Sequence, residues 1–322
     1  MRMPSRRYGR GGGLFSGRLS IILIAIAGLA VYWFSNQQKV PFSGRSQLNT
    51  IPIDQAAQLG RQSYIQILQD EPGGVLCETT TCSPGAETTV AAVRSIGERL
   101  EAAAISLERD LIDQGYRFTP VAEQFDWQYN VVPSDQPNAF CLPGGYVAVY
   151  TRIIDVAGDN DGRFEPDDDL RDLDKLAVIM GHEIGHALAH HGAERMSQQR
   201  IMQMGQLAVG LSMGDMNVAQ QQAMMKAFGF AAQGGILAFS RTHETEADKI
   251  GLDLLVRACF DPREAPALWE RMGELGGGQR PPEWLSTHPA SETRAANFRE
   301  WMPEAVAEYE RRCAGGQAPR GF

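Results

Sequence analysis

The chain has 322 residues, of which 43% are hydrophobic and 21% charged, a balance that suits a folded protein with a sizeable core. Its formal net charge is −9, and no basic patch stands out beyond the N-terminus, so the sequence predicts no nucleic-acid partner.

The N-terminal segment differs from the rest of the chain. Residues 1–18 carry five arginines, and no acidic residue precedes Asp54. The apolar run 19–35 ends in three aromatic residues of the kind found at membrane interfaces. We predict an uncleaved, single-pass signal anchor over 19–35, with a bacterial inner-membrane location and the remainder on the periplasmic side. An Arg-rich, acid-free leader also fits mitochondrial targeting, so the mitochondrial inner membrane is the alternative.

Three segments follow the predicted anchor. Residues 36–50 are polar and contain Pro41 and Gly44, which predicts a linker. Residues 51–313 are expected to form one domain, and 314–322 a flexible tail. Within the domain, Asp159-Asn160-Asp161-Gly162 resembles part of a calcium loop, but Ala157 occupies the position of the first carboxylate ligand, so no calcium is assigned.

Hydrophobic spacing predicts helices over 53–70 and 90–114. Aromatic and β-branched residues predict strands over 126–132 and 145–151, separated by a proline-containing turn. The strand 145–151 is a candidate edge strand on which an extended peptide could pair through its backbone; the alternative is that Pro143-Gly144-Gly145 is a turn that opens a covered strand.

A further helix is expected from about Asp172 to about Arg200, with a buried first half. The Met- and Gly-rich stretch 201–239 that follows is interpreted first as core. A membrane-facing patch or a substrate wall are the alternatives.

The five cysteines leave several arrangements open. Cys77 and Cys82 bracket a short loop, and Cys259 and Cys313 both lie in the C-terminal part, so two disulfides with a free Cys141 form one economical arrangement. Five buried thiols are the alternative, and zinc binding by cysteine is weaker because no CxxC pair occurs.

The motif His182-Glu183-Ile184-Gly185-His186 lies in the expected helix 172–200. Residues four apart share a helix face, so both imidazoles can bind one metal ion. Glu183 then lies beside the metal, where a carboxylate can take a proton from a bound water. The motif therefore predicts a catalytic zinc site, which usually has three protein ligands and one open position.

The segment Ser240–Asp248 offers the third ligand. Glu244 and Asp248 are four residues apart and share a helix face. One carboxylate can bind the metal while the other accepts a hydrogen bond from a ligand imidazole.

Four sequence blocks together resemble one protein family: NAFCLPGGYVAVYT, HEIGHALAHH, SRTHETEAD and PPEWLSTHPASETR, spanning residues 138 to 294. They look like the membrane-associated zinc metallopeptidase family of the CAAX prenyl protease and the HtpX-type heat-shock protease. The resemblance implies zinc ligation by His182, His186 and Glu244, with Glu183 as general base and Asp248 as the hydrogen-bond partner of a ligand. With one apolar run, the chain is similar to the single-anchor, periplasmic quality-control branch.

The other histidines are weighed separately. His190 and His191 are expected behind a ligand or at the surface and not in the ligand set, because a third ligand on one straight helix would lie too far along the axis. His243 is expected in the core or behind a ligand. His288 resembles a family position near the metal, where it could stabilise an oxyanion or occupy the open coordination position. Arg294 could clamp nearby carboxylates or form an ordinary surface salt bridge.

The sequence thus predicts an α+β, predominantly helical, zincin-type fold with an HExxH helix, a second ExxxD helix and a small β-sheet. We expect one zinc ion per chain and an endopeptidase acting on misfolded or mislocalised envelope proteins. A non-hydrolytic chaperone or assembly scaffold built on the zinc fold is the alternative.

Overall fold

The computed structural model describes residues 14–77, 82–158, 170–213, 217–275, 288 and 292–313. The fold is predominantly helical, as the sequence predicted, and its described part has two small sheets where one was expected. The helices are α1 (Leu14–Ser35), α2 (Ile53–Asp70), α3 (Pro84–Asp113), the short 3-10 helix η1 (Ala122–Gln124), α4 (Thr151–Ala157), α5 (Leu170–Leu188), α6 (His191–Met213), α7 (Val218–Arg257), α8 (Glu264–Leu275) and α10 (Glu292–Cys313). The strands are β1 (Gln37–Lys39), β2 (Ser46–Leu48), β3 (Gln128–Val132), β4 (Ala139–Leu142) and β5 (Tyr146–Tyr150).

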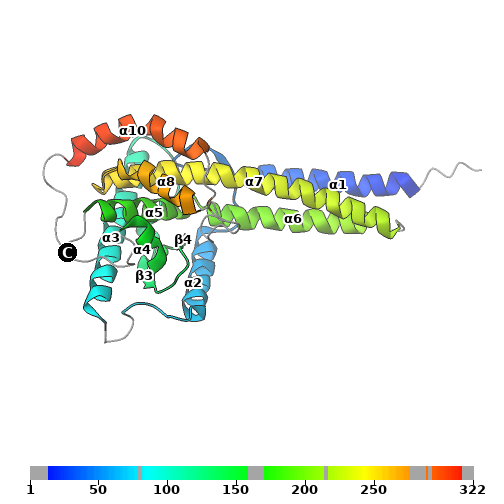
Figure 1. Cartoon of the computed structure of the whole chain (residues 1–322). Helices are drawn as coiled ribbons and strands as arrows, with labels where there is room; N and C mark the ends of the chain where they lie inside the picture. Colours follow the sequence, from blue (N-terminus) through cyan, green and yellow to red (C-terminus); the bar gives the residue numbers. More distant parts are fainter. Residues whose placement is uncertain are drawn as a thin grey trace, which may run out of the picture.

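Figure 1 shows a compact body from which three helices project side by side. The projection consists of α1, α6 and the first part of α7, and the body contains the remaining helices and the larger sheet. On α6, Met204, Leu207 and Leu211 are exposed, although core was the favoured interpretation of this stretch. Among the described residues, no helix combines the length and the hydropathy that a membrane span requires.

Helix α3 is the main support of the body. Ser83 caps its first turn and Pro84 stands at its start, where a missing N–H costs no hydrogen bond. Its buried residues include Val93, Ile96 and Leu100, which recur at helical spacing. The helix packs against α5, α7 and β3, so it fixes the two metal-site helices relative to the sheet.

The three-stranded sheet has the order β3-β5-β4, so β5 lies in the centre. Strand β5 runs parallel to β3 and antiparallel to β4. The prediction of residues 145–151 as an edge strand is therefore wrong. All five residues of β5 are buried. A strand with apolar side chains on both faces is typically covered on both faces. Strand β4 forms an edge of the sheet and packs against α5.

Two further expectations differ from the structure. The predicted linker 36–50 contains the antiparallel β1–β2 hairpin, with Val40 and Leu48 fully buried. The expected helix 172–200 is divided, because His190 has a left-handed backbone conformation (φ 57°) that ends α5. Helix α6 then starts at His191, whose side chain is buried.

Among the described helices, α5 and α7 make the most extensive contact with each other, and glycines allow their close approach. A Cβ on Gly185 would lie 2.8 Å from the backbone oxygen of Ala247, and one on Gly251 would lie 2.9 Å from the backbone nitrogen of His182. Real side chains do not fit at such distances. The close approach places the HExxH turn of α5 directly against the ExxxD turn of α7.

Disulfide bonds join Cys77 to Cys82 and Cys259 to Cys313, while Cys141 is free and buried. This is the economical arrangement considered from the sequence. Several sequence features lie outside the described residues: most of the basic segment 1–18, the acidic loop at 159–162, the tail 314–322 and most of the block 281–294.

Candidate functional site

The structure brings His182, His186, Glu244 and His288 together at the contact of α5 and α7. Each offers one ligand atom, and these four atoms lie within 4.8 Å of one another. His182 and His186 stand one turn apart on α5, and their Nε2 atoms are 3.1 Å apart. His288, a single described residue between α8 and α10, directs its Nδ1 to 3.3 Å from Nε2 of His182.

The donor atoms are spaced as they would be around one metal ion. Glu244 Oε2 lies 3.3 Å from His182 Nε2, and Oε1 lies 3.4 Å from His186 Nε2. Two ligands of a tetrahedral zinc, each about 2.0–2.1 Å from the ion, are about 3.3 Å apart. The set of imidazole nitrogens and one carboxylate is also the chemistry of a catalytic zinc, so the residues present fit a divalent metal.

Charge at the site favours a cation. Burial alone would raise the pKa of the Glu244 carboxyl, but hydrogen bonds with His182, His186 and His288 hold it well below its usual range. Burial also opposes charge on His182, yet its hydrogen bonds to Asp248 and Glu244 raise its pKa to about 9. The negative potential that attracts a proton to this ring equally attracts a metal ion.

Asp248 and Arg294 hold the ring of His182 from behind. His182 Nδ1 lies 2.9 Å from Asp248 Oδ1, and Arg294 donates two hydrogen bonds of 2.7 Å to the same carboxylate. Arg294 is buried and stacks 3.7 Å above the ring of Trp269. Of the two alternatives for Arg294, the structure therefore favours the clamp. Burial works against the Asp248 carboxylate, but Arg294 and His182 lower its pKa.

Glu183 lies next to His182 on α5 and lines a cavity of about 310 Å³ beside the cluster. Its carboxylate Oε1 is 3.6 Å from Nε2 of His288. The cavity is bordered on one side by α5 and on the other by residues 138–143, which include the edge strand β4. His190 also lines this cavity and lies outside the ligand cluster, in line with the sequence expectation.

A largely buried polar cluster lies behind His186, and the sequence indicated only its two histidines, as residues behind a ligand. It consists of Arg45, His191, Glu194, His243 and Glu246, and His191 contacts His186 directly, with 2.8 Å between their Nδ1 atoms. The turn at His190 carries His191 back to the metal site, which a continuous helix would not do. Arg45 had no signal at all, because it lies in the segment predicted as a linker.

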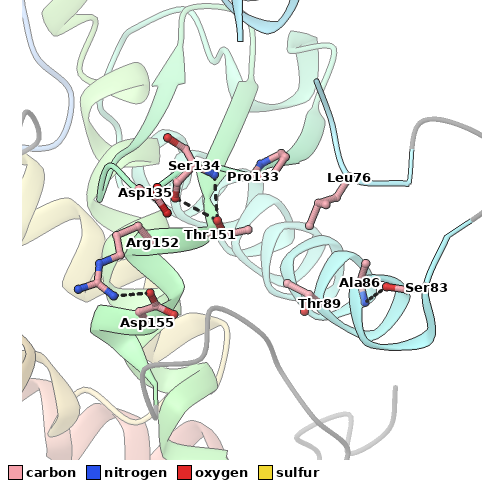
Figure 2. A pocket seen from close by; sticks show the side chains of 10 residues that line it. All are labelled: Leu76, Ser83, Ala86, Thr89, Pro133, Ser134, Asp135, Thr151, Arg152 and Asp155. Carbon is pink, nitrogen blue, oxygen red and sulfur yellow. Dashed lines mark hydrogen bonds and ion pairs between the residues drawn. The ribbon is translucent and has the colours of Figure 1, made fainter. Parts of the chain in front are cut away.

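A larger cavity, of about 650 Å³, lies apart from these residues (Figure 2). It is formed by the start of α3, the end of β3 and the start of α4, and its charged lining residues are Asp135, Arg152 and Asp155. Arg152 and Asp155 pair with each other at 2.6 Å. None of the predicted site residues lines this cavity, so size does not identify the functional site here.

Comparison with known proteins agrees with this geometry. The family model described as peptidase family M48 matches residues 108–302. The chain is 31% identical over 290 residues to mitochondrial metalloendopeptidase OMA1 of Schizosaccharomyces pombe, covering 88% of this chain and 72% of that protein. It is 27% identical over 304 residues to the human mitochondrial metalloendopeptidase OMA1, covering 91% of this chain and 50% of that protein.

It is also 31% identical over 181 residues to the beta-barrel assembly-enhancing protease of Escherichia coli, covering 54% of this chain and 34% of that protein. The expectation of a membrane-associated metallopeptidase family is thus confirmed, through these endopeptidases and not specifically through the prenyl protease or the heat-shock protease. By this similarity and by its zincin-like fold, the chain is a metalloendopeptidase that belongs to peptidase family M48.

Proposed function

We propose that the chain is a zinc-dependent endopeptidase whose metal ligands are His182, His186 and Glu244. The observation that carries the proposal is the spacing of their donor atoms, 3.1 to 3.4 Å, which suits one tetrahedral ion. Zinc, when bound, supplies a water of lowered pKa and polarises the carbonyl to be attacked. Asp248 and Arg294 keep the His182 ring oriented toward the ion.

Glu183 is the general base in this proposal. Its carboxylate is buried and borders the cavity beside the cluster, so a water there lies within its reach. It takes the proton of the attacking water and passes it to the leaving amine. A chaperone or scaffold without turnover would not require a base at this place, which argues against that alternative.

His288 is proposed to occupy the fourth ligand position when no substrate is bound. Its Nδ1 is 3.3 Å from His182 Nε2 and 3.1 Å from Glu244 Oε2, the same spacing as between the three ligands. If a water is to bind at that position, His288 would have to leave it first. Of the two roles considered from the sequence, these distances favour occupation of the open position over oxyanion stabilisation.

The substrate is proposed to be an extended, unfolded polypeptide. Strand β4 forms the edge of the sheet and lines the cavity with Glu183, so an extended segment can pair with its backbone and pass the metal. Backbone pairing selects an unfolded shape more than particular side chains. We therefore propose misfolded or mislocalised envelope or membrane proteins as the physiological class.

The proposed location is a membrane, through an anchor at 19–35. Exposed large apolar residues on the described part of the projection support it: Leu23, Ile24, Ile26, Val31 and Phe34 on α1, Met204, Leu207 and Leu211 on α6, and Val218 and Met225 on α7. The two disulfides favour an oxidising compartment, such as the bacterial periplasm. The names of relatives describe mitochondrial enzymes, so the mitochondrial inner membrane is kept as the alternative proposal.

The test uses the full chain in detergent and labelled, reduced casein as an unfolded substrate. We expect cleavage that stops with a chelator and returns with zinc. Glu183→Gln should retain zinc but lose at least about 100-fold in kcat, the usual range for a general base. Cleavage that persists in the chelated protein and in Glu183→Gln would contradict the proposed mechanism.

A further inference from the structure

The two histidines of the HExxH motif are supported in parallel ways. Behind His182 stands one carboxylate, Asp248, which is held by Arg294. Behind His186 stands the buried cluster of Arg45, His191, Glu194, His243 and Glu246. In that cluster a carboxylate is again held by an arginine, but a second imidazole lies between the carboxylate and the ligand ring.

The contacts behind His186 form a directed chain of hydrogen bonds. With Nε2 of His186 facing the metal site, its Nδ1 carries the proton and donates to His191 Nδ1, 2.8 Å away. His191 then carries its own proton on Nε2 and donates it to Glu246 Oε2, at 2.9 Å. This is the only assignment in which each of these bonds has one donor and one acceptor.

Arg45 ends the chain of bonds. Its guanidinium donates to Glu246 Oε2 through Nε and one terminal nitrogen, at 3.0 and 2.8 Å, and to both carboxylate oxygens of Glu194 at 3.0 and 2.8 Å. Ser43 also donates to Glu246. Both carboxylates are nearly inaccessible to solvent, so the planar fork of Arg45 is their main compensating charge.

The second carboxylate holds the chain of bonds in place from the side. Glu194 accepts a hydrogen bond of 2.8 Å from His243 Nε2, and the ring of His243 stacks on that of His191 with 4.2 Å between centroids. The His191 ring is thus bounded by a stacked ring on one face and hydrogen-bonded at both nitrogens. The His191 ring is therefore held in one orientation, and its hydrogen bond to His186 holds the His186 ring in place as well.

Arg45 reaches this place from the β1–β2 hairpin, the segment that directly follows α1. The turn of the hairpin is closed by backbone hydrogen bonds between Val40 and Arg45 and between Gly44 and Val40. Buried Val40 and Leu48 fix the hairpin to the body. The projecting helix α1 and the metal site are therefore joined through the few residues of this turn.

We propose that Arg45 is a positioning residue of the peptidase. Through Glu246 and His191 it fixes the tautomer and the orientation of His186, so the hairpin behind α1 is part of the working metal site. The inference rests on the zinc endopeptidase function proposed above. Partners behind a metal ligand typically contribute 10- to 100-fold in metal affinity or activity, and this sets the expected size of the effect.

The experiment compares Arg45→Met, Arg45→Lys and the control Lys39→Met in the full chain. Lys39 lies exposed on β1 of the same hairpin, so its substitution removes the same charge without touching the cluster. Zinc affinity is measured by competition with a chromophoric chelator, and kcat and KM with labelled casein. Near-ultraviolet circular dichroism of each variant reports whether the body is folded.

We expect Arg45→Met to weaken zinc binding about 10- to 100-fold and to lower kcat with little change in KM. Arg45→Lys should show a smaller loss because it keeps the positive charge, but not full activity, because one ammonium cannot bridge both carboxylates. The control Lys39→Met should match the unaltered protein. A folded Arg45→Met variant with unchanged zinc affinity and kcat would overturn the proposal.

If Arg45→Met does not fold, His191→Phe tests the same inference. It breaks the chain of bonds to His186 while Glu246 keeps Arg45 as its partner, so no buried charge is left alone. The same loss of zinc affinity is expected, and a folded His191→Phe with unchanged affinity would refute the inference. If the unaltered protein neither binds zinc nor cuts casein, the proposed function fails first, which is a distinct outcome.

Discussion

Gly185 offers a direct way to separate the two halves of the metal site. An added Cβ would lie 2.8 Å from the Ala247 backbone oxygen, and a helix backbone cannot yield to it cheaply. Gly185→Ala must therefore push α5 away from α7. This moves the HExxH motif on α5 away from Glu244 on α7. Overpacking of this kind costs about 1–3 kcal/mol, from which the better helix propensity of alanine returns up to about 1 kcal/mol.

Gly210→Ala is the matched control for this substitution. Gly210 lies in α6 with no atom within 4 Å of an added Cβ, so only the propensity gain remains. Urea unfolding in the presence of a chelator should show Gly185→Ala less stable and Gly210→Ala more stable, by up to about 1 kcal/mol for the control.

Zinc affinity should follow the geometry and fall at least about tenfold in Gly185→Ala, the range found when the support of a metal ligand is disturbed. It should stay unchanged in Gly210→Ala. Equal stability and equal zinc affinity of Gly185→Ala and the unaltered protein would refute the close-contact argument.

Three further substitutions test a buried acid, the support of His182 and a disulfide bond. Burial raises the pKa of Asp174 from 3.8 to about 6, so its carboxylate destabilises the fold above that pH and the penalty disappears as the pH falls below 3.8. Asp174→Asn should therefore stabilise the protein at pH 7 by no more than about 3 kcal/mol, and by about 2 kcal/mol after allowing for partial exposure. In thermal unfolding near pH 3.5 the substitution should have no effect. Asp248→Asn removes the charge behind His182 and should weaken zinc binding about 10- to 100-fold in a chelator competition, whereas unchanged affinity would exclude its supporting role. Cys259→Ser opens a bridge with a sequence separation of 54 and should lower the free energy of unfolding by about 4 kcal/mol, an effect absent if Cys259 and Cys313 are unbonded in solution.

The parts of the site that sequence could predict are those set by local helix geometry. His182 with His186, and Glu244 with Asp248, are pairs at a spacing of four, and each pair shares a helix face whatever surrounds it. The helix at 53–70 and the presence of a small sheet follow in the same way from hydrophobic spacing, whereas α4, α8 and α10 were not predicted.

The parts that sequence could not predict depend on tertiary contacts. The helix ends at His190, a non-glycine residue in the left-handed conformation, so the sequence carries no glycine signal for this break. Without the break, His191 would point away from His186. The central place of β5 is decided by the pairing of β3 and β4 on its two sides. Arg45 reaches Glu246 across a sequence separation of 201, which no local pattern encodes.

Zinc X-ray absorption on the loaded protein measures directly whether His182, His186 and Glu244 hold the ion. We expect one zinc per chain with nitrogen and oxygen ligands at about 2.0–2.2 Å, at least two of them imidazoles, with one imidazole fewer in His182→Ala or His186→Ala and one ligand fewer in Glu244→Ala. Sulfur ligands at about 2.3 Å, or a ligand set unaffected by the substitutions of His182, His186 and Glu244, would contradict it.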